Sequence, residues 1–226
     1  MNSVLPLVSG AVSLAFTAFL LQRFASRKGM HHLAWSLGML LYAAGGLCEA
    51  WYGFFGWSAT VFRVWYICGA FLSAAWLGQG TLYLLARRRP WVHALAAVLV
   101  LGSLFAAVRV ATALLDPSLA AAGRQMTGKV IVSPGVRTLT PIFNVYGTLA
   151  LVGGAAWSAW LLLRSRGLPH RVVGSVLIAV GALLPALGGS FSRLGLDALL
   201  YASELLGALL MFAGFLLSTR PAQPRP

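Results

Sequence analysis

The sequence predicts an all-α membrane protein, a bundle of seven transmembrane helices with its N-terminus outside and its C-terminus in the cytoplasm. The 226-residue chain is 59% hydrophobic and only 9% charged, and its mean hydropathy is +0.83. This composition is typical of membrane proteins and not of soluble domains. Its apolar stretches reach the roughly 20 residues that a spanning helix needs, and clusters of basic residues separate them in a regular order.

Seven apolar stretches are predicted to span the membrane, within one domain of residues 1–219. Because the stretches are continuously apolar, they favour helices over barrel strands, which would alternate apolar and polar residues over about 10 positions. Most of the connecting turns are short, as in a compact bundle of antiparallel neighbours. The predicted spans are residues 3–22, 32–52, 59–86, 91–114, 141–163, 171–191 and 197–218.

The predicted orientation follows from the basic residues. The first, third, fifth and seventh spans are each followed by a basic cluster. All four acidic residues lie toward the other side of the membrane. Short basic loops stay in the cytoplasm, so we expect a multi-pass protein of the cell inner (plasma) membrane with its N-terminus outside. The clusters are Arg23, Arg27 and Lys28; residues 87–89; Arg164, Arg166 and Arg171; and Arg220 and Arg225. The acids are Glu49, Asp116, Asp197 and Glu204.

The net charge of +13 is explained by this bias and by attraction to anionic lipid head groups. The expected partner is therefore the lipid bilayer. No nucleic acid is expected, because no soluble basic domain would bind it. No basic region precedes the first apolar stretch, which favours an uncleaved span over a signal peptide. Residues 220–226 are too short and proline-rich to fold, so we expect a disordered tail. Any output would pass through a partner membrane or signalling protein.

The predicted outer loop, residues 115–140, is much longer than the other connections. It contains the turn signals Asp116-Pro117 and Pro134-Gly135, and residues 129–132 are apolar enough for a short strand. A loop of this length in a compact domain is usually functional or disordered. Two interpretations therefore remain, a cap over the outer mouth of the bundle and a mobile surface loop.

Glycines recur seven residues apart in four of the spans. Seven residues are nearly two helical turns, so each set lies along one helix face. Small residues on one face let membrane helices approach closely, and we therefore expect these faces to point inward. The sets are Gly38 and Gly45; Gly147 and Gly154; Gly174, Gly181 and Gly188; and Gly207 and Gly214.

Several polar residues share these glycine faces. Glu49 follows Gly45 by four residues, and Asn144 and Glu204 each precede a glycine by three, so all three should face inward. Each belongs to the outer half of its span, and Arg63 is expected at a similar depth. Pro185 should kink the sixth span and free a carbonyl group. The sequence predicts an outward-facing polar pocket lined by Glu49, Arg63, Tyr66, Asn144, Tyr201 and Glu204.

Two interpretations of this predicted pocket stay open. A charge at mid-span costs about 2.5–3.5 kcal/mol on insertion scales, so it is usually paired or functional. In the first interpretation, Arg63 forms an ion pair with Glu49 or Glu204 that fixes helix register. In the second, Glu49 and Glu204 bind a cation or a hydroxyl group of a ligand. Arg63 then holds the two carboxyl groups in place or binds an anionic group of the ligand.

The chain carries no sign of catalytic, metal or cofactor chemistry, and we expect no enzyme activity and no cofactor. It has no nucleophile elbow, no zinc-protease motif and no cysteine pair at metal-ligand spacing. The seventh span has no lysine for a retinal Schiff base.

The four histidines lie at inner span ends, where interfacial anchoring is favoured over metal ligation. Cys48 and Cys68 are expected at different depths, as free thiols. Gln79 is expected to bond to a neighbouring helix.

The chain resembles the seven-helix sensor region of some bacterial histidine kinases. The pattern comprises Ala34-Trp35-Ser36-Leu37-Gly38, Leu47-Cys48-Glu49-Ala50 and Phe62-Arg63-Val64-Trp65-Tyr66, followed by residues 181–188 and Gly195-Leu196-Asp197. The resemblance implies small-ligand binding or membrane sensing, although those sensors carry an attached kinase that this chain lacks. Residues 135–154 also resemble a family of uncharacterised bacterial membrane proteins, which implies no function.

The sequence thus predicts a sensor-like or receptor-like membrane protein that binds a small ligand or lipid in the outward-facing pocket. A first alternative is a small transporter or channel, in which the pocket also opens to the inside. A second is a non-catalytic subunit of a membrane protein complex.

Overall fold

The computed structural model describes residues 3–86, 89–120, 126–165, 168–192 and 197–219. Within these ranges, seven helices are long and apolar enough to cross a membrane, as expected of a multi-pass membrane protein. Five of them are α1 (Val4–Arg27), α2 (Met30–Phe55), α5 (Pro90–Ala111), α8 (Pro169–Ser192) and α9 (Asp197–Ser218). The other two are continuous helical segments built from α3 (Ala59–Trp65), η1 (Tyr66–Leu72) and α4 (Ser73–Leu85), and from α6 (Val136–Thr148), η4 (Leu149–Gly153) and α7 (Gly154–Arg164).

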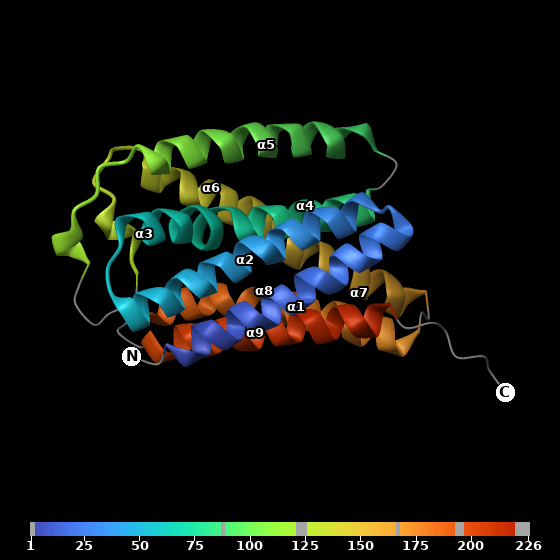
Figure 1. The fold of residues 1–226 in the computed structure, drawn as a ribbon. Helices are drawn as coiled ribbons and strands as arrows, with labels where there is room; N and C mark the ends of the chain where they lie inside the picture. Colours follow the sequence, from blue (N-terminus) through green and yellow to red (C-terminus); the bar gives the residue numbers. More distant parts are fainter. Residues whose placement is uncertain (1–2, 87–88, 121–125, 166–167, 193–196, 220–226) are drawn as a thin grey trace.

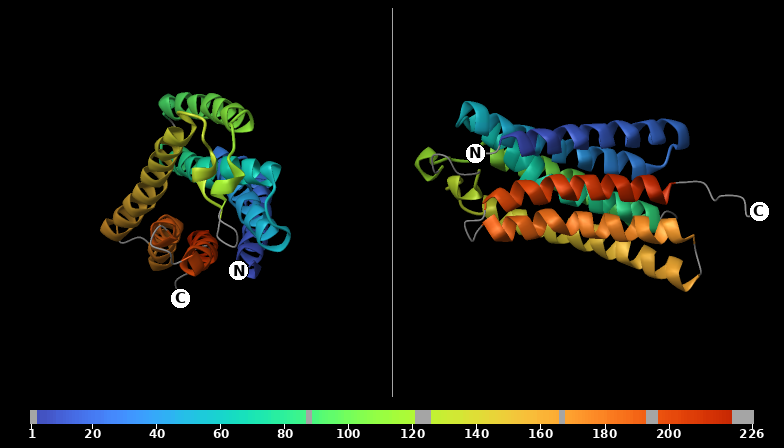
Figure 2. Two further views of the ribbon diagram at one scale, coloured as in Figure 1. Left: turned by 90° about the vertical axis from the view of Figure 1, so that its left-hand side faces the viewer. Right: turned by 90° about the horizontal axis from the view of Figure 1, so that it is seen from below.

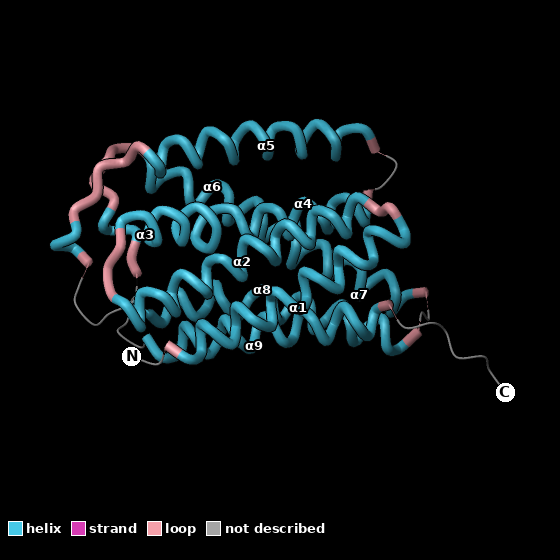
Figure 3. Tube along the Cα trace, viewed as in Figure 1, coloured by secondary structure: helices cyan, strands magenta, loops and turns pink. Residues whose placement is uncertain are grey.

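The long helices run side by side, and the non-helical segments gather at the two ends of the bundle (Figures 1 and 3). One end holds the connection between α5 and α6, and we call it the loop end. The other holds Arg23, Arg27, Arg89, Arg164 and Arg171, and we call it the basic end. The seven spans and their all-α architecture confirm that part of the sequence prediction.

The segment α4 lies in the middle of the bundle, with α5 at its edge. Viewed from the loop end, α4 is surrounded by α2, α5 and the α6–α7 segment (Figure 2, left). Eight of its 13 residues are buried, Gln79 completely. By contrast, Leu101 and Val108 of α5 are 67% and 62% exposed. In a bilayer, this apolar outer face of α5 would contact lipid.

Gln79 satisfies its buried amide within the bundle. Its Nε2 donates a hydrogen bond to the Val92 carbonyl oxygen of α5 at 3.0 Å, and its Oε1 accepts one from the Tyr146 hydroxyl of α6. The predicted bond to a neighbouring helix is confirmed, and one amide ties the peripheral α5 to the central α4. An unpaired amide at this depth would be costly because no water is present to replace its partner.

Two spans contain π-helical segments, η1 and η4, which widen the helix by one residue. In η1 the Ser73 N–H donates to the carbonyl of Cys68, five residues earlier. The widened turn also presents the Ala70 carbonyl to α6, where Asn144 Nδ2 donates to it at 2.9 Å. The Asn144 amide therefore stabilises a backbone irregularity, a use that the sequence pattern did not indicate.

The glycine faces predicted from the sequence do meet neighbouring helices. A Cβ atom on Gly45 would lie 2.7 Å from the Cα of Gly69 in η1. Gly181 and Gly207 face each other across α8 and α9, and Gly207 also packs against the Pro185 ring. All nine glycines of the four sets contact another helix in this way, which confirms the inward orientation. Close backbone approach is the usual source of helix association in lipid.

The connection at the loop end is shorter and better packed than the sequence predicted. The helix α6 begins at Val136, so the connection ends five residues earlier than expected. Its described part carries two 3-10 turns, η2 (Pro117–Leu119) and η3 (Gly128–Val130). The side chains of Met126, Val130 and Ile131 join the core cluster that includes Phe62 and Tyr66. This packing favours the cap interpretation over a mobile loop.

The predicted strand at residues 129–132 is not formed. Lys129 and Val130 belong to the 3-10 turn η3, and a single antiparallel bridge pairs Ile131 with Leu115. The turn directs the Val130 side chain into the core, which an extended segment on the surface would not do. The predicted disordered tail, residues 220–226, lies outside the described residues.

The closeness of the helices at Gly147 gives a stability prediction. A Cβ atom there would overlap the carbonyl group of Ala74 in α4, whereas one on Gly153 of the same span would meet nothing within 4 Å. We expect Gly147→Ala to lower the unfolding free energy by about 1–3 kcal/mol through overpacking, and the control Gly153→Ala to leave it within about 0.5 kcal/mol. Thermal unfolding of both variants in detergent checks this. Equal melting temperatures would contradict the packing of α4 on α6.

Candidate functional site

Glu49 and Glu204 come together near the loop end, from helices far apart in the sequence. Glu49 lies six residues before the end of α2 and Glu204 seven residues after the start of α9. At 1.5 Å per residue, each is about 9–10 Å inside its helix end. Their carboxyl groups interact directly with each other. The sequence prediction that both face inward at the same depth is therefore matched by this structure.

The Glu49 side chain is buried but only half satisfied. It is 5% exposed, and its Oε1 accepts a hydrogen bond from Trp65 Nε1 of α3 at 2.9 Å. Its Oε2 has no hydrogen-bond partner. A buried carboxyl oxygen without a partner costs free energy, so this atom marks a place where a donor or a cation would be stabilising.

Two more oxygen-bearing side chains border the carboxyl pair. Tyr42, seven residues before Glu49 on α2, donates its hydroxyl hydrogen to the backbone carbonyl of Glu204 at 2.9 Å. This bond holds α9 against α2. Ser9 of α1 is 1% exposed, and its side chain interacts with the Tyr42 hydroxyl. We call Ser9, Tyr42, Glu49, Trp65 and Glu204 the carboxyl site.

The ion pair with Arg63 that the sequence left open is not formed. The Arg63 guanidinium Nη2 instead donates to the backbone carbonyl of Ala113 at 3.1 Å. That carbonyl lies just past the C-terminal end of α5, where helix carbonyls lack internal partners and favour a cation. Neither Glu49 nor Glu204 has a cationic partner among the residues that the structure describes.

Tyr66 and Asn144 lie between the third span and α6, away from the carboxyl site. Tyr66 is buried, and its hydroxyl shares a hydrogen bond of 2.8 Å with Thr140 of α6. Asn144, one turn further along α6, donates to Ala70 as described above. Tyr201 is buried on α9, three residues before Glu204. The six predicted residues therefore do not form one pocket: Glu49 and Glu204 meet each other, whereas Arg63, Tyr66 and Asn144 bond elsewhere. Trp65, which bonds to Glu49, and Tyr66 are adjacent rings with centroids 5.9 Å apart.

Sequence reasoning missed the residues that complete the carboxyl site. Trp65 carries an indole N–H on the face next to Tyr66, and only the fold shows that it reaches Glu49. Tyr42 and Ser9 had a detectable signal, because Tyr42 lies two turns before Glu49 on the same helix face. Within the described ranges, no group of three or more His, Cys, Asp or Glu residues is positioned to hold a metal ion.

A cavity at the basic end is lined by none of the six predicted residues. It encloses about 680 Å³ and is lined by five basic side chains from α1, α2 and α8 together with apolar and hydroxyl-bearing residues. The five are Arg23, Arg27, His31, His32 and Arg171. Searches against protein-family models, curated proteins and solved structures found no match to this chain.

The half-satisfied carboxyl of Glu49 gives a stability prediction. Glu49→Gln keeps an acceptor for Trp65 and removes one of two facing acidic groups, so we expect a higher melting temperature by about 2–4 °C, equivalent to about 1 kcal/mol. The matched variant Glu49→Met leaves the Trp65 N–H unpaired and should lower the unfolding free energy by about 1–3 kcal/mol. Thermal unfolding in detergent without added ligand measures both. Destabilisation by Glu49→Gln would instead indicate that the charged group has a structural partner.

Proposed function

We propose that this protein is a sensor-like or receptor-like integral membrane protein that binds a small ligand through the carboxyl site. The proposal rests on the buried Glu49 carboxyl group, whose Oε2 receives no hydrogen bond from an N–H or hydroxyl group and which interacts with the Glu204 carboxyl. The ligand class that suits these atoms is a small cation, or a molecule with a cationic or hydroxyl group. The loop that packs over this end would control access to the site.

The chemistry of the site supports a ligand more than a purely structural role. A structural ion pair would place a guanidinium or ammonium group against the carboxyl groups. The Arg63 guanidinium instead donates to the Ala113 carbonyl just past the end of α5. The oxygens of Glu49, Glu204, Ser9 and Tyr42 offer several acceptors to one small group. Binding there would compensate two acidic groups that face each other in a buried site.

The first test of the proposed function is native mass spectrometry of the protein extracted gently from its own membranes. We expect a bound small molecule or ion in the wild type that is absent from Glu204→Gln, because the variant removes one of the two acidic groups. The matched control is Arg109→Gln, at the same end but bonded to the Pro134 carbonyl. It should keep the bound mass.

Three outcomes of that measurement would decide between the alternatives. A bound mass lost in Glu204→Gln supports the proposal and identifies the ligand. A stoichiometric protein partner with no small bound mass would mean a subunit of a larger complex. If the bound mass is kept in both variants, the carboxyl site does not bind it, and the proposal is wrong.

We also propose that the loop end faces the outside and the basic end the cytoplasm of a bacterial-type inner membrane. The support is the charge bias between the two ends, because short basic loops remain in the cytoplasm. Exposed Ser118 lies at the loop end and exposed Ser26 at the basic end, so they offer matched labelling positions.

A cysteine-labelling experiment checks this orientation. In a Cys48→Ala/Cys68→Ala background, an impermeant maleimide should label Ser118→Cys in intact cells. It should label Ser26→Cys only after permeabilisation. The opposite pattern would invert the proposed topology and place the carboxyl site on the cytoplasmic side.

A further inference from the structure

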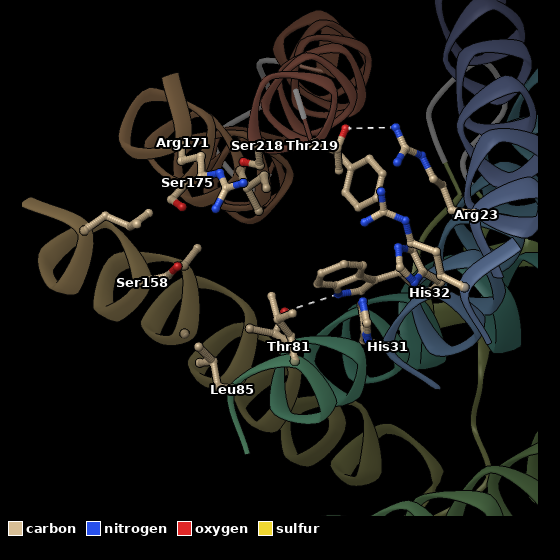
Figure 4. Close-up of a pocket in the computed structure, with 18 residues that line it drawn as sticks. Arg23, His31, His32, Thr81, Leu85, Ser158, Arg171, Ser175, Ser218 and Thr219 are labelled. Carbon is tan, nitrogen blue, oxygen red and sulfur yellow. Dashed lines mark hydrogen bonds between the residues drawn. The ribbon is translucent and has the colours of Figure 1, made fainter. Parts of the chain in front are cut away.

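The cavity at the basic end is formed by six helices whose ends converge. Arg23 and Arg27 come from α1, His31 and His32 from α2, and Arg171 from α8, while α4, α7 and α9 complete the wall. Figure 4 shows Arg23 and Arg171 reaching toward the same space from opposite sides. At about 680 Å³, the cavity falls within the range of about 300–1,000 Å³ that small-molecule sites occupy.

The positive charge of this cavity is not balanced by the protein. The chain has only four acids, Glu49, Asp116, Asp197 and Glu204, and none of them lines the cavity. The three arginines reach the same cavity from α1 and α8 and repel one another, although Arg27 and Arg171 are themselves exposed to solvent. Because these side chains come from different helices and meet at one cavity, a bound anion could contact several of them at once.

Two buried polar atoms in the lining also lack partners. His32 is 6% exposed, and its Nδ1 has no hydrogen-bond partner; the Oγ of Ser218 likewise has none. Arg23 Nη2 reaches only the Thr219 hydroxyl, at 3.4 Å, which is long for a hydrogen bond (Figure 4). The Ser218 Oγ lies against Gly174 and the His32 Nδ1 beside Gly29, so Arg23, Arg27 and Arg171 are the donors available to the cavity, whose described lining contains no acidic side chain.

The deeper wall of the cavity is apolar and rigid. Trp35 Nε1 donates to the Leu77 carbonyl at 3.1 Å and to the Thr81 hydroxyl at 3.3 Å, which fixes the indole against α4. The Phe215 ring packs edge-on against Trp35, with centroids 5.6 Å apart. The cavity thus offers basic groups at one end and an aromatic and aliphatic surface behind them.

We infer that this cavity binds a phosphate-bearing anion, held by Arg23, Arg27 and Arg171. A phosphate group accepts several hydrogen bonds at once, and arginine binds it in a charge-assisted, often bidentate manner. Two sources supply this chemistry in a membrane, the head group of an anionic phospholipid and a free phosphate-containing solute. The apolar wall favours the lipid.

The test uses the full protein in detergent with two probes at constant ionic strength, dioctanoyl phosphatidic acid and inorganic phosphate. Binding of each probe is measured by native mass spectrometry and by the shift in melting temperature. We expect Arg23→Gln and Arg171→Gln each to weaken binding by about tenfold or more, the usual loss for a charge-assisted hydrogen bond to phosphate. The control Arg164→Gln removes a charge at the same end, from a residue that stacks on Trp160 and does not line the cavity. It should change binding less than twofold.

Each outcome decides the inference. Binding of phosphatidic acid alone identifies a lipid head-group site, and equal binding of inorganic phosphate identifies a solute site. Failure of both probes to bind, or equal loss in Arg164→Gln, overturns the inference and leaves only a generally basic surface. Glu204→Gln should bind both probes normally. The phosphate-binding inference and the proposed function of the carboxyl site are therefore tested independently.

Discussion

The separation of opposite charges along one apolar bundle is the constraint from which both proposed sites follow. The carboxyl pair lies near the loop end, and the arginines of the cavity lie at the basic end, with most of the length of several helices between them. A helix of 20 residues is about 30 Å long, and interactions over such distances contribute little compared with a contact pair. Each set of charges must therefore be compensated locally, by the protein, by lipid or by a ligand.

Local compensation by the protein is incomplete at both ends. Near the loop end, the one arginine placed at the right depth, Arg63, stabilises the carbonyl end of α5. At the basic end, the cavity has no acid in its lining. Close helix packing prevents simple relief by rearrangement, because Gly45 and Gly69 bring α2 against η1, and Gly181 and Gly207 bring α8 against α9. The bundle holds both sets of charges in place, and neither has a counterion among the residues that the structure describes.

The spans could be predicted because length and continuous hydrophobicity are sufficient evidence for a membrane helix. Boundaries were less certain where polar residues continue a helix at its end. For example, α6 starts at Val136 and contains Arg137 and Thr138, which hydropathy assigned to a loop. The inward glycine faces and the partner of Gln79 were also predictable, since periodicity and the cost of a buried amide are local properties. The arrangement of the helices in space is not a local property. The contact of Trp65 with Glu49 and the division of the predicted pocket therefore emerged only from the fold.

The basic cavity could not be predicted from charge alone, because a basic cluster after a span is the ordinary mark of a cytoplasmic loop. Arg23 and Arg27 are four residues apart and share one helix face, but Arg171 is joined to them only by the packing of α8 and α9 beside α1. The π-helical segments were equally hidden, and they redirect Asn144 from the predicted pocket to the Ala70 carbonyl. In both cases the determining contacts are between residues distant in the sequence.

The most direct test of these two uncompensated sites is an experimental density map of the protein purified in its own lipids. We expect density for a ligand or ion against the Glu49 and Glu204 carboxyl groups, and density for a tetrahedral anion between Arg23 and Arg171, with Arg63 still bonded to Ala113. An ion pair between Arg63 and Glu49, with the arginines of the basic end turned away from an empty cavity, would contradict it.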